Sequence, residues 1–216
     1  MLSLYGRNTL VKTFIICTLL AVASLFSPNT LKVLLLTAAA CILLFTLYFF
    51  RDPSRRIPSD PNAILAPADG RILLIKKIAH PFTGPDSTLI SIFMSLFNVH
   101  VNRIPLSGKV TQLSYHPGKF LMAFDHSSIN NNERMEIGLE NSGFRIFFTQ
   151  VSGFVARRIV CNLKVGDTVQ AGNRFGMIKF GSRLDIIIPD GIPLAVSEGQ
   201  KTIAGETVIA RHNTTT

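Results

Sequence analysis

Two long apolar runs stand at the start of the 216-residue chain. Residues 9–26 carry a single charge, Lys12, and residues 31–50 carry a single charge, Lys32. At 1.5 Å of rise per residue, each run is about long enough as a helix to cross a hydrocarbon core of about 30 Å. Neither run has a clear polar face, which argues against two core helices of a soluble domain. The pattern predicts a membrane-associated helical hairpin over residues 1–50.

Two alternatives stay open for this region. The small residues "AVAS" at 21–24 are typical of a signal-peptide cleavage site. A second apolar run follows at once, so cleavage there would still leave a membrane anchor. A hairpin that lies flat in the membrane interface is the other alternative.

Basic residues flank the predicted hairpin, whereas its connection "SPNT" is uncharged. Arg7 and Lys12 lie at its beginning, and Arg51, Arg55 and Arg56 follow its end. Because basic flanks tend to stay in the cytoplasm, we expect both ends and the rest of the chain on the cytoplasmic side of the cell membrane.

The pattern changes after the hairpin. Residues 51–63, "RDPSRRIPSDPNA", contain three prolines and predict an extended basic linker. Residues 64–216 show short or alternating apolar runs broken by Gly and Pro, which is typical of strands. Residues 95–104 fit either a strand or a helical turn. We therefore expect a mainly β domain over residues 64–216, sandwich-like or barrel-like, with few short helices.

Weak internal repeats support a β fold. "PADGRI" and "PLSGKV" share one pattern, and "GDTVQAGN" and "GQKTIAGE" share another. Such units turn at Gly, which takes positive φ freely, and then enter a strand. They resemble the half-motifs of lipoyl-type and biotinyl-type β-sandwiches.

Composition narrows the range of functions. Apolar residues make up 47% of the chain and charged residues only 16%, which favours a membrane protein. The net charge of +9 comes without the aromatic and basic interleaving that is typical of nucleic-acid binding. The basic residues after the hairpin fit attraction to anionic lipid headgroups and also fit a positive-inside anchor without lipid specificity. Three cysteines and five histidines show no disulfide or metal-ligand spacing, and we expect no metal.

Gly181 and Ser182 in "FGSRLD" form either an ordinary tight turn or a bond that the chain cuts itself. If the Ser182 hydroxyl attacks the Gly181 carbonyl carbon, the amide becomes an ester. Elimination and hydrolysis then leave a pyruvoyl group at position 182 and release ammonia. Gly has no Cβ to hinder the approach, but the serine needs a base and the base an orienting acid.

Asp69 in "APADGRI" and His100 in "FNVHVNRIP" are candidates for the acid and the base. Taken alone, Asp69 fits a turn residue before Gly and His100 fits a buried core histidine. His116 and His126 are rival bases. His116 precedes Pro-Gly and fits a turn, whereas His126 lies in the polar stretch "FDHSSINNNER", which fits a loop near substrate.

Eight motifs in order carry a family resemblance over nearly all of residues 49–190. They are "FFRDPSR", "PADG", "NVHVNRIPLSG", "YHPGKF", "NNER", "VARRIVC", "GDTVQAGNRFG" and "FGSRLD". Together they closely resemble the short, membrane-associated form of phosphatidylserine decarboxylase. The longer form ends its cleavage motif in Gly-Ser-Thr, whereas this chain has Gly-Ser-Arg.

The resemblance implies roles for these residues. Ser182 would be the self-cleavage serine and the source of a covalent pyruvoyl cofactor, with no pyridoxal phosphate. His100 would activate Ser182 and later supply a proton, and Asp69 would orient His100. His126, Arg157 and Arg158 are weaker candidates for contacts with substrate.

The resemblance also implies an activity and partners. Phosphatidylserine would lose carbon dioxide to give phosphatidylethanolamine in phospholipid biosynthesis, with the pyruvoyl ketone as electron sink. Two self-cleaved chains, joined between residues 181 and 182 in the precursor, would stay together as a non-covalent heterodimer, with or without further oligomerisation.

Two alternatives belong to other classes. A membrane-anchored lipoyl-like binding or carrier module would need a modifiable lysine in a hairpin, and "MIKF" at 177–180 is the nearest candidate. A pyruvoyl enzyme acting on a soluble amino acid is disfavoured by the apolar N-terminus.

Overall fold

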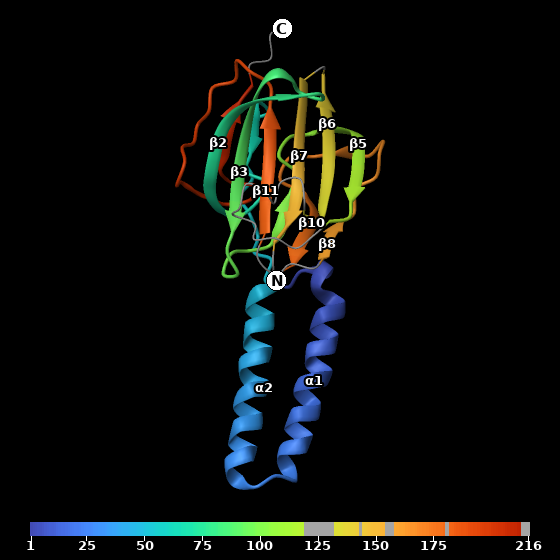
Figure 1. Cartoon of the computed structure of the whole chain (residues 1–216), viewed down its shortest axis with the longest axis vertical. Helices are drawn as coiled ribbons and strands as arrows, with labels where there is room; N and C mark the ends of the chain where they lie inside the picture. Colours follow the sequence, from blue (N-terminus) through green and yellow to red (C-terminus); the bar gives the residue numbers. More distant parts are fainter. Residues whose placement is uncertain (119–131, 143, 154–157, 180–181, 213–216) are drawn as a thin grey trace. The chain divides into compact units, whose positions relative to one another are not determined.

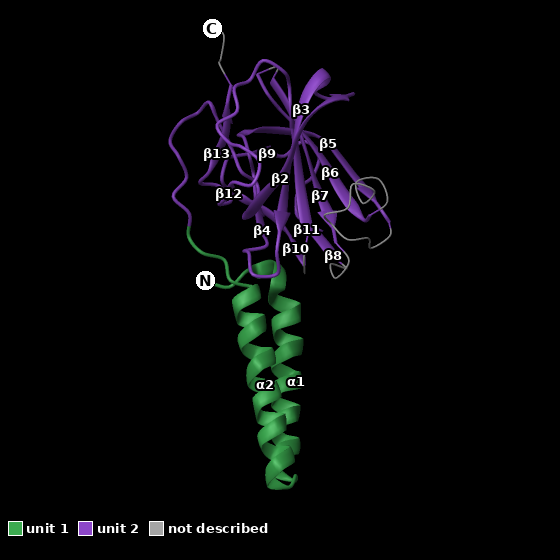
Figure 2. Ribbon diagram, turned by 60° about the vertical axis from the view of Figure 1, so that its left-hand side comes forward, with its two compact units in different colours: residues 1–54 green, residues 55–216 purple. Residues whose placement is uncertain are grey.

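The chain forms two compact units, Met1–Ser54 and Arg55–Thr216, which Figure 2 distinguishes by colour. The structure is a computed structural model, and it describes residues 1–118, 132–142, 144–153, 158–179 and 182–212. Each unit is described by itself.

The first unit is the predicted helical hairpin. A short 3₁₀ helix, η1 (Leu4–Gly6), precedes α1 (Arg7–Leu25) and α2 (Asn29–Phe49). The two ends of the unit are tied together, because Ser3 donates its N–H to the Phe50 carbonyl at 2.8 Å. The predicted N-terminal apolar hairpin is therefore confirmed, and the strands of the second unit confirm the mainly β class.

Small side chains line the contact between α1 and α2, while large apolar side chains point outward. Cys17 in α1 donates its thiol to the Ala39 carbonyl of α2, with 3.3 Å between the atoms. Phe14, Leu19, Leu34 and Leu44 are exposed. Both helices are long and apolar enough to cross a membrane, and little of either is buried in the protein. These features are consistent with membrane association.

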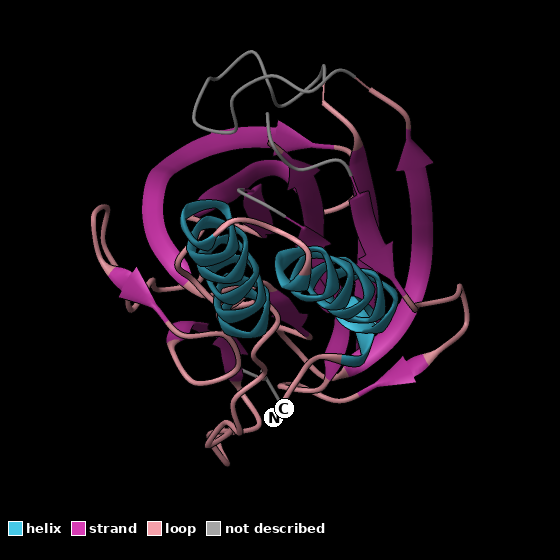
Figure 3. Cartoon of the chain, turned by 90° about the horizontal axis from the view of Figure 1, so that it is seen from below, coloured by secondary structure: helices cyan, strands magenta, loops and turns pink. Residues whose placement is uncertain are grey.

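The second unit is built from antiparallel strands, which Figure 3 shows curving round a common interior. Its largest sheet has eight strands in the order β12-β2-β3-β11-β7-β6-β5-β9, and Figure 1 shows the six long ones side by side. Their bounds are β12 (Lys201–Thr202), β2 (Gly70–His80), β3 (Gly84–Met94), β11 (Ser182–Ile188), β7 (Phe144–Ser152), β6 (Arg134–Asn141), β5 (Gly108–His116) and β9 (Thr168–Val169).

Two smaller sheets complete the second unit. One has the order β4-β10-β8 and the other pairs β1 with β13. Their bounds are β4 (Val101–Arg103), β10 (Arg174–Lys179), β8 (Arg158–Cys161), β1 (Ala63–Leu65) and β13 (Val208–Arg211).

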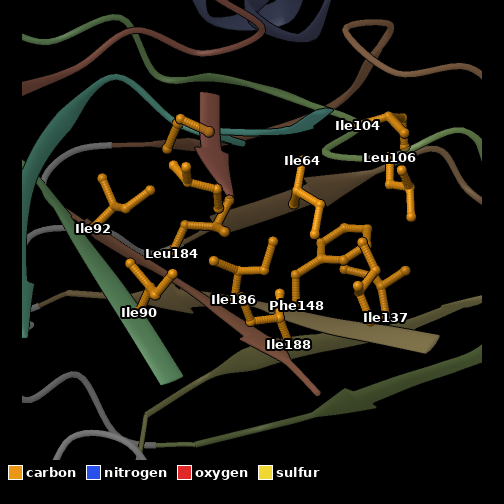
Figure 4. Packing of buried hydrophobic residues seen from close by; sticks show 14 of the residues in the cluster. Ile64, Ile90, Ile92, Ile104, Leu106, Ile137, Phe148, Leu184, Ile186 and Ile188 are labelled. Carbon is orange, nitrogen blue, oxygen red and sulfur yellow. The ribbon is translucent and has the colours of Figure 1, made fainter. Parts of the chain in front are cut away.

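One continuous hydrophobic core lies inside the curled sheet. Alternate residues of β11, Leu184, Ile186 and Ile188, point into it, as the two-residue period of a strand requires. Ile64 from β1 and Leu106 from the segment after β4 meet them from the opposite side (Figure 4). Burial of these side chains supplies the main free energy that closes the sheet.

The repeated Gly motifs turn as the sequence predicts. Gly172 in "GDTVQAGN" and Gly205 in "GQKTIAGE" have φ of +80° and +77°. They also pack together, because a Cβ on Gly205 would lie 3.5 Å from the Gly172 Cα. A larger side chain at either position would be strained by its backbone conformation.

Candidate active site

Ser182 is the first residue of β11, the strand between β3 and β7. In the two ladders it lies opposite Met94 of β3 and Ser152 of β7. Its side chain is fully buried, and its Oγ has no hydrogen-bond partner among the residues that the structure describes. A buried hydroxyl of this kind calls for an explanation, and a reactive role is one.

His100 lies just before β4 and is fully buried. Its carbonyl accepts a hydrogen bond from the N–H of Ile178 in β10 at 3.3 Å, so its backbone lies beside the strand that leads toward β11. Its ring Nδ1 lies 2.9 Å from the Asn98 carbonyl oxygen. A carbonyl can only accept a hydrogen bond, so Nδ1 carries the proton and Nε2 is the basic nitrogen.

The side chain of Asn102 shows which way this face of the β4 segment points. Residues 100 and 102 share one face because side chains alternate along a strand. Asn102 accepts a hydrogen bond from Gln150 Nε2 at 2.8 Å, and its Nδ2 lies 3.7 Å from the Met94 Sδ. Since Met94 is the ladder partner of Ser182, this face is turned toward the end of the sheet that holds Ser182.

Asp69 lies just before β2, and its carboxylate is already hydrogen-bonded. Arg55 donates from Nη2 to both carboxylate oxygens, at 2.9 and 2.8 Å, and the Ala204 N–H donates at 2.8 Å. The preceding segment runs antiparallel to β4, because the Arg103 N–H donates to the Pro67 carbonyl at 2.9 Å and the Leu65 N–H donates to the Pro105 carbonyl at 2.8 Å. Asp69 therefore lies near the start of β4, with Arg55 as its charged partner.

The other predicted residues contribute less to the described site. Arg158 begins β8 opposite Lys179 and is exposed. Gly181, His126 and Arg157 lie outside the described residues.

Sequence reasoning did not single out an ion pair directly after the predicted cleavage site. Arg183 and Asp185 are buried on the face of β11 opposite the core, with Arg183 Nε 2.9 Å from Asp185 Oδ1. Burial raises the pKa of Asp185, and the Arg183 charge opposes that rise. The signal was the alternation of "SRLD", which puts both charges on one face of a strand.

Other contributors escaped sequence reasoning because they depend on strand pairing. Ser152, Asn102 and Gln150 come from β7 and β4, and no local motif links them to Ser182. Among the described residues, no group of three His, Cys, Asp or Glu side chains could hold a metal ion.

The fold and site define a class of protein: a β enzyme domain, preceded by an apolar hairpin, whose central strand begins with a buried serine that has no hydroxyl partner within the described ranges. The profile of the phosphatidylserine decarboxylase family matches residues 42–210. The chain belongs to this family, and it is a decarboxylase, a lyase of phospholipid metabolism.

Similar proteins cover nearly the whole chain. The phosphatidylserine decarboxylase proenzyme of Chlorobium phaeobacteroides (strain BS1) is 66% identical over 97% of this chain and 98% of its own length. The proenzyme of the same name from Prosthecochloris aestuarii is 59% identical over 98% of this chain and 97% of its own. That of Chlorobaculum tepidum is 57% identical, covering 96% of each.

Proposed function

We propose that the chain cuts itself between Gly181 and Ser182 and then decarboxylates phosphatidylserine to phosphatidylethanolamine. Membership of the family supports the substrate and the reaction. The observation that carries the self-cleavage is the buried hydroxyl of Ser182, which has no partner among the described residues. The name "proenzyme" of the relatives agrees with a processed precursor.

Maturation would take place in three steps. The Ser182 oxygen attacks the Gly181 carbonyl carbon, the C–N bond breaks, and the nitrogen takes up the hydroxyl proton. Loss of the Cα proton of residue 182 then breaks the Cβ–O bond and frees Gly181 as a carboxylate. Water converts the remaining enamine to a ketone and releases ammonia. His100 is the base in this proposal, with its Nε2 as the proton acceptor.

The site suits a pyruvoyl group derived from Ser182, which would supply an electron sink for the carboxylate's bonding electrons. The position of Ser182 between β3 and β7 would fix the group in the sheet. His100 would donate the proton that the substrate carbon takes up. The ion pair of Asp69 with Arg55 would fix the segment that precedes β2 beside β4. Through this contact with β4, Asp69 would help to orient His100, which lies just before that strand.

The chain is divided into three regions in this proposal. We propose that residues 1–50 form the membrane hairpin, residues 51–63 the linker and residues 64–216 a catalytic domain on the cytoplasmic side. The exposed apolar side chains of both helices and the basic flanks support this arrangement. His126, Arg157 and Arg158 stay candidates for contacts with the lipid headgroup.

Mass spectrometry of the purified protein tests the proposal. Wild type should give a chain of 181 residues and a chain of 35 residues that begins with pyruvoyl. Ser182→Ala should stay a single chain and be inactive. Ser91→Ala removes another buried serine hydroxyl, from the opposite face of β3, and should still be cleaved. An active, uncleaved Ser182→Ala protein would end the pyruvoyl hypothesis.

A further inference from the structure

Three buried polar side chains form a row beside the proposed cleavage site. Ser182 lies opposite Ser152 in the β11–β7 ladder. Ser152 in turn donates its N–H to the Glu133 carbonyl at 2.9 Å, which continues the pairing of β7 with β6 by one residue. The row therefore crosses three neighbouring strands of the sheet at the same level.

All three side chains point to the same side of the sheet. Ser182 shares its face with Leu184, and Glu133 shares its face with Ile137, because alternate residues of a strand face one way. Both Leu184 and Ile137 belong to the hydrophobic core. The row thus lies on the inner face, at the end of the core.

Each member of the row has a buried polar atom without a partner among the described residues: the Oγ of Ser182, the Oγ of Ser152 and the Oε2 of Glu133. Ser182 and Ser152 are 0% exposed and Glu133 is 8% exposed. Cβ atoms directly opposite in a sheet are about 4.5–5.5 Å apart, so neighbouring polar atoms can meet directly or through one water. Three such groups in a row indicate a shared role, since a buried polar atom without a partner destabilises the fold.

The row reaches solvent through Tyr115 of β5. The Tyr115 hydroxyl donates to Glu133 Oε1 at 3.0 Å, and the tyrosine is 54% exposed. The hydrogen bond to Glu133 raises the pKa of Tyr115, so the phenol stays protonated and keeps donating to the carboxylate. Groups that can give and take protons thus lie in order from the surface to residue 182, and the outermost pair, Tyr115 and Glu133, is already hydrogen-bonded.

Decarboxylation requires a supply of protons to the site. When carbon dioxide leaves, the electron pair of the broken C–C bond stays on the substrate carbon and takes up one proton. Each turnover therefore consumes one proton, and the buried site must draw it from solvent.

We propose that Tyr115, Glu133 and Ser152 form the route by which protons from solvent reach the site at residue 182. The inference rests on the proposed function. In each passage His100 gives its proton to the substrate carbon, and a proton from Ser152 replaces it through water at the site. Ser152 takes up a proton from Glu133, Glu133 takes one up from Tyr115, and solvent restores the proton of Tyr115. Glu133 and Ser152 act through their neighbours and are positioning residues for proton transfer.

The test compares Glu133→Gln and Ser152→Ala with two matched controls, Glu136→Gln and Ser91→Ala. Glu136 lies in β6, three residues after Glu133, and its carboxylate bonds His116 and Arg134. Ser91 of β3 lies on the face of the sheet opposite to the row. Mass spectrometry first measures the matured fraction of each variant, and kcat is expressed per matured site. We expect kcat to fall about 10-fold or more in the two route variants with KM little changed, and to stay near wild type in the controls.

A spectroscopic readout tests the contact between Tyr115 and Glu133 independently of the kinetics. The chain has three tyrosines and no tryptophan, so a Tyr5→Phe/Tyr48→Phe background leaves Tyr115 as its only tyrosine. Titration of its ultraviolet absorbance should show a lower pKa in Glu133→Gln and no change in Ser152→Ala. An unchanged pKa in Glu133→Gln would remove Glu133 from the route.

The remaining outcomes are also decisive. If matured Glu133→Gln and Ser152→Ala keep the wild-type kcat, the route is wrong while the proposed function stands. If wild type itself is never cleaved, the proposed function fails, whatever the variants do. Should Glu133→Gln fail to fold, Ser152→Ala and Tyr115→Phe decide, and Tyr115→Phe should lower kcat less because water can replace its hydroxyl.

Discussion

The imidazole of His100 is held by its own chain. Its Nδ1 lies 2.9 Å from the carbonyl oxygen of Asn98, two residues earlier, so the orientation of the ring depends on the turn after β3. The Asn98 side chain in turn accepts hydrogen bonds from the N–H and the hydroxyl of Ser95, at 2.9 and 2.8 Å. The turn therefore presets the tautomer that a general base needs.

Replacement of His100 tests this role. His100→Ala should slow self-cleavage by roughly 10²–10⁴-fold, which is the usual weight of general-base catalysis. Asp69→Asn should slow it less, because the Asn98 carbonyl still orients the ring. The rate is measured by the appearance of the 35-residue chain with time. Wild-type rates of cleavage in His100→Ala would remove the histidine from maturation and make His126 the next candidate.

The matured fraction of His100→Ala tests its second role. This fraction should bind phosphatidylserine but release carbon dioxide slowly, because the substrate carbon lacks its proton donor. Release at the wild-type rate would assign that proton to another group.

His80 makes the second unit sensitive to acid. Its ring packs 4.4 Å from the ring of Phe147, and burial lowers the pKa of His80 below its usual 6.5. As pH falls below about 6.5, the unfolded chain binds a proton before the folded one does, so stability decreases until the lower folded pKa is passed. His80→Gln should remove this component, which is small because the imidazole is only partly buried. Denaturant midpoints at pH 7.5 and 5.5 check it, and an equal loss in both proteins would contradict it.

At the scale of elements, the sequence predicted kinds of structure better than their pairing. The two apolar runs predicted α1 and α2, and the two-residue period predicted most strands. Residues 95–104 fitted either a strand or a helical turn, and they form a non-helical turn followed by β4. The order of the large sheet could not be predicted, because β11 pairs with β3 and β7, which lie far from it in the sequence.

The same limit applies to the site. Ser182, His100 and Asp69 lie in recognisable motifs, so a sequence can nominate them. Arg55 could not be assigned to Asp69, nor Ser152 to Ser182, because those contacts exist only once distant segments pair.

Gly176 in β10 shows how closely the small sheet must pack. A Cβ there would lie 2.2 Å from the Val160 carbonyl oxygen of β8 and 3.1 Å from Gln150 Nε2. Gly176→Ala should therefore push β8 away, disturb the Gln150–Asn102 hydrogen bond, and destabilise the unit by about 1–3 kcal/mol. Thermal unfolding measures the loss.

Gly191→Asn is the control for Gly176→Ala. Gly191 has φ of +77°, nothing lies within 4 Å of the position that a Cβ would take there, and Asn tolerates this conformation. It should cost less stability, and a larger loss than in Gly176→Ala would contradict the packing argument.

At the scale of the whole molecule, self-cleavage would divide the fold without opening it. The 35 residues after the cut include β11, β12 and β13. These strands pair with β3 and β7, with β2 and with β1 of the longer chain. We therefore expect the mature chains to run separately under denaturing conditions and together in detergent without denaturant. Dissociation of the short chain without denaturant would contradict the ladder argument.

The central place of β11 has a consequence for the folding history of the enzyme. Strand β11 can pair with β3 and β7 easily during folding while all three strands belong to one chain. After the cut, β11 would belong to a separate peptide, so its pairing with β3 and β7 would be a bimolecular step and no longer the closure of a loop within one chain. A mature enzyme that has been fully unfolded should then fail to renature, whereas its uncleaved precursor can. The mature fold is thus reached only through the uncleaved precursor, because folding must come before cleavage.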